Sequence, residues 1–501
     1  MEEKKNLWSS YDEAAKKELH EINEKYKACL DAGKTERECV KLAVEMAKEA
    51  GYQDIKDVLK EGKSLKAGDK VYAVCMGKML AMFRMGEEPL SNGMNILGAH
   101  IDSPRIDVKQ NPLYESEGMA YLDTHYYGGI KKYQWVAQPL ALHGVAVLKS
   151  GKTVPICVGE KEGDPVFTIT DILIHLAGEK MEKTAAKVIE GENMDLLIGN
   201  MPLRDCKDLK EEEKELVKAN ILSILKQEYG IEEDDFQSAE LEIVPAGKAR
   251  DLGFDRSMIL GYGQDDRICA FTSLFAMLET ENLKKTGVCL LVDKEEIGSV
   301  GATGMQSHFF ENTVAELIAL TEGESELKVR RALSRSRMLS SDVSAAYDPL
   351  YAEHYEKRNS GFFGRGISMN KFTGVRGKSG SNDANAEYIA VLRKIFDDAN
   401  VAYQFDELGK VDAGGGGMQI TVFSKGKVVT TQHLALGTMR MREQLARKSN
   451  NLAQYELQVE ELVDKELEVF KAMYLQETKI KYLIIIGDYI SEISRKVEKN
   501  K

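Results

Sequence analysis

The feature of this sequence that most constrains its fold is the alternation of helical and strand-like segments after residue 247. ICAFTSLFAMLETENL (268–283) has helical character, GVCLLVD (287–293) predicts a buried strand, and NTVAELIALTEG (312–323) again predicts a helix. Strands that alternate with helices are typical of a sheet covered by helices. The sequence therefore predicts an α/β domain with a mixed sheet between helical layers.

A segment of different character interrupts this pattern. It holds strand-like stretches, GVAVLKSG and TVPICVG, and one long helical stretch, DLKEEEKELVKANILSILKQEYG. A chain of 501 residues also exceeds the size at which one hydrophobic core stops growing. We therefore expect two domains and a tail. The expected boundaries are 1–107 and 247–439 for the two parts of the α/β domain, 108–246 for an inserted β-rich domain, and 440–501 for a charged, helical C-terminal segment.

Composition excludes several classes of partner. The formal net charge of −13 disfavours binding to nucleic acid or to anionic membranes, because like charges repel. The run Tyr482–Ile486 is too short to cross a bilayer, and the charged N-terminal segment lacks the apolar core of a signal peptide. Seven scattered cysteines without CxxC spacing are typical of reduced thiols. These features predict a cytoplasmic protein.

The first candidate site residues follow an apolar run in NILGAHIDSP. His100 ends this run and Asp102 comes two residues later, on the same side of an extended chain. An imidazole is a good zinc ligand, and a neighbouring carboxylate can hold its other ring N–H. The same pair is also compatible with an ordinary histidine in a polar loop.

Two acidic pairs and a single aspartate occupy similar positions. Asp265 and Asp266 precede a predicted helix, where they could cap its N-terminus or bridge two cations. Glu295 and Glu296 follow a buried strand, so one could ligate a metal while its neighbour faces a substrate. Asp342 follows another short apolar run and could equally be a turn residue.

Together these residues form a coherent ligand set. His100, Asp265, Glu296, Asp342 and one further histidine would offer only nitrogen and oxygen. Such donors suit a pair of Zn²⁺, Mn²⁺ or Co²⁺ ions about 3.5–4 Å apart. The expected chemistry is hydrolysis by activated water.

Several motifs, in order along residues 15–417, resemble the aspartyl aminopeptidase family of dinuclear metallopeptidases. They are GAHIDSPR, THYYGGI, FTITDILIHLA, QDDR, DKEEIGS, SSDVSAAYDPLY and NKFTG. The resemblance implies a zinc-peptidase-like α/β domain interrupted by a β-rich dimerisation domain, and assembly into dimers and often a tetrahedral dodecamer. It implies removal of the N-terminal residue from peptides, with Asp or Glu as the favoured residue.

The resemblance also implies roles for individual positions. His100, Asp265, Glu296 and Asp342 resemble metal ligands, with Asp265 bridging both ions, and Glu295 resembles the general base. Asp102 resembles the residue that supports the histidine ligand. His175 matches a histidine that reaches a neighbouring subunit's site, and Lys371 matches a lysine that favours acidic substrates.

The sequence departs from the family pattern at one ligand. The family ends its site with a histidine in a segment like LxMHSxxE, whereas the closest stretch here, LALGTMRMRE, places Gly437 at that position. We expect His433 to substitute through a shifted register. The departure leaves open a non-catalytic assembled paralogue with a degenerate metal site. A dinuclear hydrolase of N-acyl amino acids is a further alternative.

Overall fold

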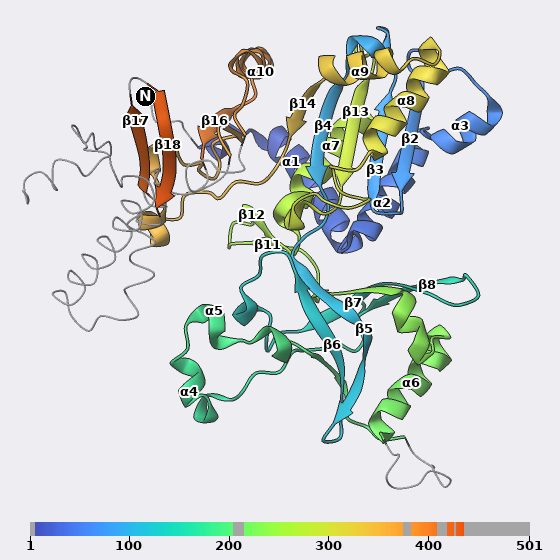
Figure 1. Ribbon diagram of the computed structural model, residues 1–501, viewed down its shortest axis with the longest axis vertical. Coiled ribbons are helices and arrows are strands. Elements are labelled where there is room, and N and C mark those ends of the chain that lie inside the picture. Colours follow the sequence, from blue (N-terminus) through green and yellow to red (C-terminus); the bar gives the residue numbers. More distant parts are fainter. Residues whose placement is uncertain (1–5, 204–214, 374–381, 408–417, 425–426, 435–501) are drawn as a thin grey trace, which may run out of the picture. The chain divides into compact units, whose positions relative to one another are not determined.

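The computed structural model describes residues 6–203, 215–373, 382–407, 418–424 and 427–434 (Figure 1). Residues 13–343 form one compact unit, and the described residues of 6–12 and from 344 onward form another. The predicted tail 440–501 and the glycine run 414–417 lie outside the described residues.

A six-stranded mixed sheet lies at the centre of the first unit, in the order β1-β2-β3-β13-β4-β14 (Figure 1). Its strands are β1 (Gln53–Asp54), β2 (Lys70–Cys75), β3 (Met79–Arg84), β4 (Asn95–His100), β13 (Gly287–Val292) and β14 (Arg337–Ser340). Strand β13 is the segment GVCLLV, and all six of its residues are buried. A strand buried on both faces requires a helical layer on each side.

Helices supply these two layers. One face packs against α1 (Glu13–Ala32), α2 (Glu36–Glu49) and α7 (Gln264–Glu279). The other face packs against α3 (Ile55–Glu61), α8 (Phe309–Glu322) and α9 (Glu326–Arg335). Along β13, Leu290 belongs to one core while Cys289 and Leu291 belong to the other, as expected from the alternation of side chains along a strand.

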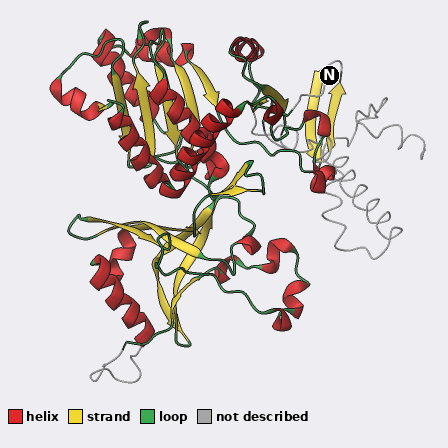
Figure 2. Cartoon of the chain, turned by 180° about the vertical axis from the view of Figure 1, so that it is seen from behind, coloured by secondary structure: helices red, strands yellow, loops and turns green. Residues whose placement is uncertain are grey.

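A second six-stranded sheet, entirely antiparallel, is built from residues between β4 and α7 (Figure 2). Its order is β8 (Thr153–Val158), β7 (Leu140–Val147), β10 (Ala239–Pro245), β5 (Arg105–Ser116), β6 (Met119–Tyr127) and β9 (Leu196–Gly199). Helix α6 (Leu216–Tyr229) packs against its core, and the short helices α4 (Gly178–Met181) and α5 (Ala185–Val188) follow β8 in the chain. A two-stranded ribbon, β11 (Arg250–Leu252) and β12 (Met258–Leu260), leads back to α7. The α/β class and the β-rich insertion agree with the sequence analysis, while the domain boundaries remain a prediction.

Buried charges join the inserted sheet to helix α2. Arg105, at the start of β5, is 4% exposed, and its guanidinium lies 3.4 Å from Glu36 on α2, 2.8 Å from Asp107 and 3.2 Å from Glu242 on β10. Burial of Glu242, followed by its proximity to Glu36, raises the pKa of Glu242 well above its usual value. Removal of one partner from a buried network of this kind is costly, because it leaves an uncompensated charge.

The second compact unit holds two small sheets. Strand β15 (Ile367–Asn370) pairs in parallel with β16 (Tyr403–Asp406), and α10 (Ala386–Asp398) connects them. Strands β17 (Met418–Ser424) and β18 (Lys427–Leu434) form a hairpin. Among the described helices of the chain, none combines the length and the apolar character that crossing a lipid bilayer would require.

Candidate metal centre

Three parallel strands deliver polar side chains to one edge of the mixed sheet. Strand β4 pairs in parallel with β13 and with β14, so the carboxyl ends of all three strands meet at the same edge. His100 ends β4, Glu295 follows β13 in the short helix η8 (Glu295–Ile297), and Asp342 follows β14. The carboxyl edge of such a sheet is where α/β proteins place their sites.

The side chains converge on the His100 ring. Its Nε2 lies 3.2 Å from Asp265 Oδ1, 3.9 Å from Asp342 Oδ1 and 3.9 Å from Glu295 Oε2. Ligand atoms of His100, Asp265 and Asp342 lie within 4.8 Å of one another. The histidine side chain is 3% exposed, whereas the carboxylates of Asp265, Asp342 and Glu295 are 56%, 59% and 48% exposed. The histidine therefore forms the floor of the centre, and the acids line its open side.

Asp265 reaches the centre because the first turn of α7 is not helical. Gly263 precedes the helix with φ +80°, and Asp265 and Asp266 have non-helical backbone angles and are joined by a cis peptide bond. No side chain caps this helix, so the capping interpretation of the aspartate pair does not describe this turn. Ser103 Oγ donates to the backbone carbonyl of Asp265 at 2.7 Å, and this bond fixes the turn beside His100.

Asp102 holds the acidic loop more closely than it holds the histidine. Its carboxylate accepts the backbone N–H groups of Glu295 and Glu296 at 3.2 Å each, and the Tyr127 hydroxyl at 2.7 Å. The Nδ1 of His100 lies 2.9 Å from the backbone carbonyl of Asp102 and 3.4 Å from its carboxylate. The backbone carbonyl is thus the nearer acceptor for the ring, and it leaves Nε2 free to face the acids.

Glu296 sits against Gly128, the glycine that directly follows β6 of the inserted sheet. Gly128 has φ +72°, and a Cβ at this position would lie 3.3 Å from Glu296 Cβ. Burial, and next the charge of Asp265, raise the pKa of Glu296 to about 7. Glu296 is therefore packed close to the same cluster of acids.

The electrostatics of the centre fit a cation. Burial is the largest cause that raises the pKa of Asp342 and of Glu295, and neighbouring carboxylates raise both further. Among the described residues, no lysine or arginine forms an ion pair with Asp265, Glu295, Glu296 or Asp342. Crowded carboxylates with one imidazole and no basic partner form a donor set for a divalent metal ion.

Comparison with known proteins agrees with this arrangement. The family of aminopeptidase I zinc metalloproteases (M18) matches residues 29–441. A probable M18 family aminopeptidase 1 from Clostridium acetobutylicum is 60% identical over 417 residues, which cover 83% of this chain and 89% of the relative.

The chain belongs to the M18 family of zinc metalloproteases. Its fold matches the crystal structure of aminopeptidase I from Clostridium acetobutylicum with a TM-score of 0.76 and 57% identity, over 83% of this chain and 90% of that one. An M18 aminopeptidase from Thermotoga maritima matches with the same TM-score of 0.76 and 41% identity, over 83% of this chain and 89% of that one. The chain is therefore a metallo-aminopeptidase, and the predicted family, fold class and enzyme class are confirmed.

Three further predicted residues of this M18 aminopeptidase lie on other elements, and their part in the site stays a prediction. His175 lies in the short helix η4 (Ile174–Leu176) of the inserted domain and is exposed. Lys371 is exposed in the second compact unit, with its ammonium 5.1 Å from the Phe372 ring. His433 pairs with Gln419 in the β17–β18 hairpin, and its side chain lies outside the described residues.

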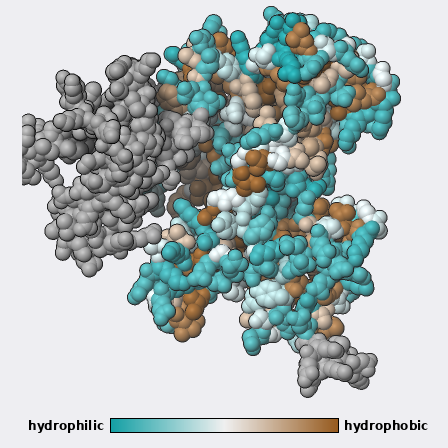
Figure 3. Space-filling model, in the orientation of Figure 1, coloured by the Kyte–Doolittle hydropathy of each residue, from teal (hydrophilic) through white to brown (hydrophobic). Residues whose placement is uncertain are grey.

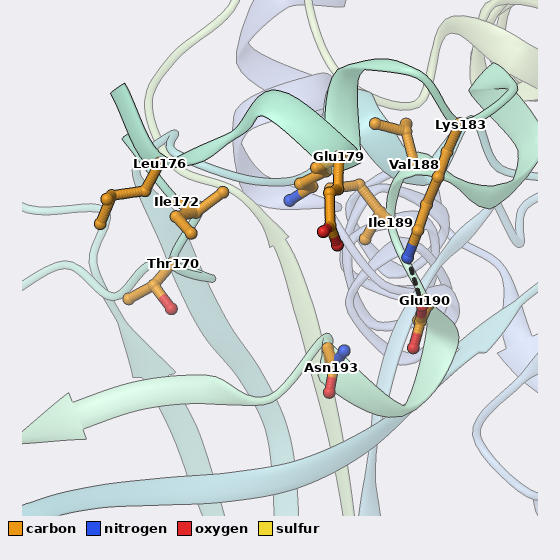
Figure 4. A pocket seen from close by; sticks show the side chains of 10 residues that line it. Thr170, Ile172, Leu176, Glu179, Lys183, Val188, Ile189, Glu190 and Asn193 are labelled. Atoms are coloured by element: carbon orange, nitrogen blue, oxygen red, sulfur yellow. Dashed lines mark hydrogen bonds and ion pairs between the residues drawn. The ribbon is translucent and has the colours of Figure 1, made fainter. Parts of the chain in front are cut away.

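A pocket of about 300 Å³ lies beside the His175 segment and not at the metal centre (Figure 4). Ile172 and Leu176 line one side of this pocket, and the ion pair between Lys183 and Glu190 lines the other at 2.8 Å. His175 itself is not among the lining residues.

Sequence reasoning assigned no role to Ser103, Tyr127 and Gly128, although GAHIDSPR and THYYGGI contain them. Each supports the centre from a distance along the chain: Ser103 bonds to the α7 turn, Tyr127 to Asp102, and Gly128 makes room for Glu296. The signal in the sequence was a tyrosine followed by a glycine at the end of a strand. Its role is visible only in the structure, where the end of β6 lies beside the loop that follows β13.

Proposed function

We propose that this M18 aminopeptidase holds two divalent ions and hydrolyses the N-terminal peptide bond with Glu295 as general base. The observation that supports the proposal is the convergence of His100, Asp265, Asp342 and Glu295 at one sheet edge without a basic partner. When bound, the ions would supply Lewis-acid chemistry that polarises the peptide carbonyl and acidifies water. Zinc is the expected metal, with manganese or cobalt as other candidates of the same ligand preference.

The residues around the two ions would take separate roles. Asp265 would bridge the two ions, His100 and Asp342 would complete one of them, and Glu296 would ligate the other. Glu295 stands 3.9 Å from His100 and is half exposed, so it can reach a substrate that enters from the open side. In this role it takes the proton of the attacking water and returns it to the leaving amine.

Replacement of Glu295 tests the base assignment. Glu295→Gln removes the proton acceptor but keeps the size of the side chain, so turnover should fall by at least about 10²-fold. Metal content per chain should stay at the wild-type value, as measured by elemental analysis alongside aminopeptidase assays. Glu296→Gln is the matched variant, because loss of a ligand should lower the metal content as well. Normal turnover in Glu295→Gln would contradict the assignment.

The last ligand of the second ion decides between an active enzyme and a degenerate paralogue. Two metal ions per chain, with loss of one in His433→Ala, would support the proposal that His433 replaces the family histidine. Zero or one ion per chain, together with absent turnover, would instead favour the non-catalytic paralogue. Cleavage of N-acylated substrates without cleavage of free-amine substrates would favour the acylamino acid hydrolase.

Preference for acidic N-terminal residues is part of the same proposal. Lys371 would pair with the substrate's side-chain carboxylate, and a charge-assisted pair of this kind contributes about 1.5–3 kcal/mol. Lys371→Met should therefore lower kcat/KM for Asp and Glu substrates by about 10- to 100-fold while leaving a Leu substrate unaffected. An equal change for all three substrates would assign Lys371 a structural role.

We also propose that the enzyme acts as a homo-oligomer in the cytoplasm. One solved structure with this fold, 18% identical, is a dodecamer of yeast mApe1. The segment around His175 is exposed and apolar: Ile174 is 66% exposed, Leu176 68% and Met181 65%. Figure 3 shows apolar brown patches of this kind among a largely hydrophilic teal surface. A contiguous patch of large exposed apolar side chains is typical of an association surface. Light scattering should give a mass of at least a dimer, and His175→Ala should reduce turnover by depriving the neighbouring site of its imidazole.

A further inference from the structure

A second group of potential metal ligands lies at the junction of α2 with the inserted sheet. Glu38 on α2, His143 on β7 and Cys157 on β8 each offer one ligand atom, and these atoms all lie within 4.8 Å of one another. His143 and Cys157 are cross-strand partners in the β7–β8 pair. His143 is 1% exposed, whereas Cys157 is exposed at the surface, so the group has a buried floor and an open side.

The carboxylate of Glu38 is held in place by the backbone. Its Oε2 accepts the N–H groups of Lys34 at 3.0 Å and Thr35 at 3.1 Å, in the capping box that begins α2. Its other oxygen, Oε1, lies 2.8 Å from His143 Nδ1. One oxygen therefore fixes the carboxylate, and the other faces the imidazole and the position that an ion would take.

The imidazole of His143 is fixed from its other side. Glu160 Oε1 lies 3.1 Å from His143 Nε2, and the buried ammonium of Lys34 donates to the same oxygen at 2.6 Å. Histidine ligands of metal ions typically donate their second ring N–H to a carboxylate, which sets the tautomer and the ring orientation. Glu160 supplies that partner, so Nδ1 is the nitrogen available to an ion beside Glu38.

The charge balance of the group permits a divalent ion. Burial alone would lower the pKa of His143, but contacts with Cys157, Glu160 and Glu38 outweigh it and raise this pKa to about 11. The metal-free cluster thus has two carboxylates opposite one imidazolium and one ammonium, and it is neutral. A divalent ion that displaces one proton from the imidazolium and one from the Cys157 thiol leaves the net charge unchanged. Both protons pass to solvent.

We propose that Glu38, His143 and Cys157 form a binding site for a single Zn²⁺ ion, separate from the catalytic pair. Nitrogen, sulfur and carboxylate oxygen are zinc's usual protein ligands, and three protein ligands leave a fourth position for water from the open side. The ion would tie α2 to β7 and β8, and so would hold the inserted sheet against the helical layer. This site shares no residue with the metal centre at His100 and does not depend on the proposed catalytic roles.

Co²⁺ provides a spectroscopic probe that distinguishes this thiolate-containing site from the centre at His100. A thiolate bound to Co²⁺ gives an intense near-ultraviolet charge-transfer band, whereas ligands that offer only nitrogen and oxygen, as at His100, Asp265 and Asp342, give none. Titration of metal-free full-length protein with Co²⁺ should produce the band, with one ion bound per chain in excess of those at the catalytic centre. Binding to this site should release two protons per ion.

Variants separate the proposal from its competitors. Cys157→Ser, which alters an exposed side chain and is expected to fold, should abolish the band and lower the bound metal by one ion per chain. Cys269→Ser, which removes a thiol close to Asp266, should keep the band. His100→Ala should also keep it, because the band does not depend on the catalytic centre. A wild-type protein without the band at saturating Co²⁺, or a band that survives Cys157→Ser, would overturn the proposal and leave His143 as an imidazolium paired with two glutamates.

Discussion

The hydroxyl of Tyr127 offers a sharp test of how the metal centre is held. It donates to Asp102 Oδ2 at 2.7 Å, and the Asp102 carboxylate is fully buried. Burial alone would raise the pKa of Asp102, but the adjacent His100 ring and the hydrogen bond from Tyr127 outweigh it and lower the pKa below its usual value. A hydrogen bond to a buried charge contributes about 1.5–3 kcal/mol. Tyr127→Phe should therefore lower the free energy of unfolding by that amount.

The substitution isolates the hydroxyl because the ring keeps its other contact. The Arg105 guanidinium lies 3.9 Å from the Tyr127 ring centroid, and phenylalanine preserves that face. Tyr262→Phe is the matched control: its hydroxyl donates at 3.0 Å to the neutral backbone carbonyl of Pro104, and its ring also lies beneath an arginine, Arg267, at 5.3 Å. Loss of a neutral bond should cost only about 0.5–1.5 kcal/mol.

Urea unfolding of metal-free protein measures both variants. A Trp8→Phe background leaves Trp135, buried in the same compact unit, as the fluorescent reporter. The folded pKa of Asp102 lies below its unfolded value of about 3.9, so its stabilisation is present above that pH and is lost as the pH falls further. The difference between Tyr127→Phe and wild type should shrink below about pH 4. Equal losses for the two tyrosine variants at neutral pH would refute the account of Asp102 as a charged anchor.

Two further predictions follow from the same geometry. Gly128→Ala should cost stability through its φ of +72° and should also lower kcat/KM, because the new Cβ meets Glu296 at 3.3 Å; Gly118→Ala, at φ +73° with no atom within 4 Å, should show only the first effect. In metal-free protein, His143 has a folded pKa of about 11, above its unfolded value of about 6.5, so its stabilisation is fully present below pH 6.5 and is lost as the pH rises toward 11. The urea midpoint should therefore fall more steeply between about pH 7 and pH 10 in the wild type than in Glu38→Gln, and parallel curves would contradict the ion pair.

Sequence patterns located much of the metal centre because strand ends carry their residues to a common edge. GVCLLV is recognisable as a buried strand, and the acids after it, the histidine that ends β4 and the aspartate after β14 meet because those three strands are parallel neighbours. The ordered motifs added the family, which the comparisons confirmed.

What the sequence could not provide are relations between distant segments. The preference of Asp102 for the backbone of Glu295 and Glu296 depends on a loop 193 residues away in the chain. The broken first turn of α7 looks like an ordinary capped helix start, because propensity does not encode a non-helical pair of aspartates held by Ser103. Glu38 on helix α2 and His143 on strand β7 are 105 residues apart in the chain, so no local spacing predicts their contact.

The buried Arg105 has a consequence for anyone who wishes to trim this enzyme. Excision of residues 106–245 would remove Asp107 and Glu242, two of the three carboxylates beside the Arg105 guanidinium, and leave Glu36 as its remaining partner in this group. Removal of partners from a buried charge lowers the free energy of unfolding by about 3–5 kcal/mol, which is a large part of the net stability of an ordinary domain. The insertion is thus not a detachable module, and a minimal catalyst engineered by deletion would require apolar replacement of both Arg105 and Glu36 before it could fold.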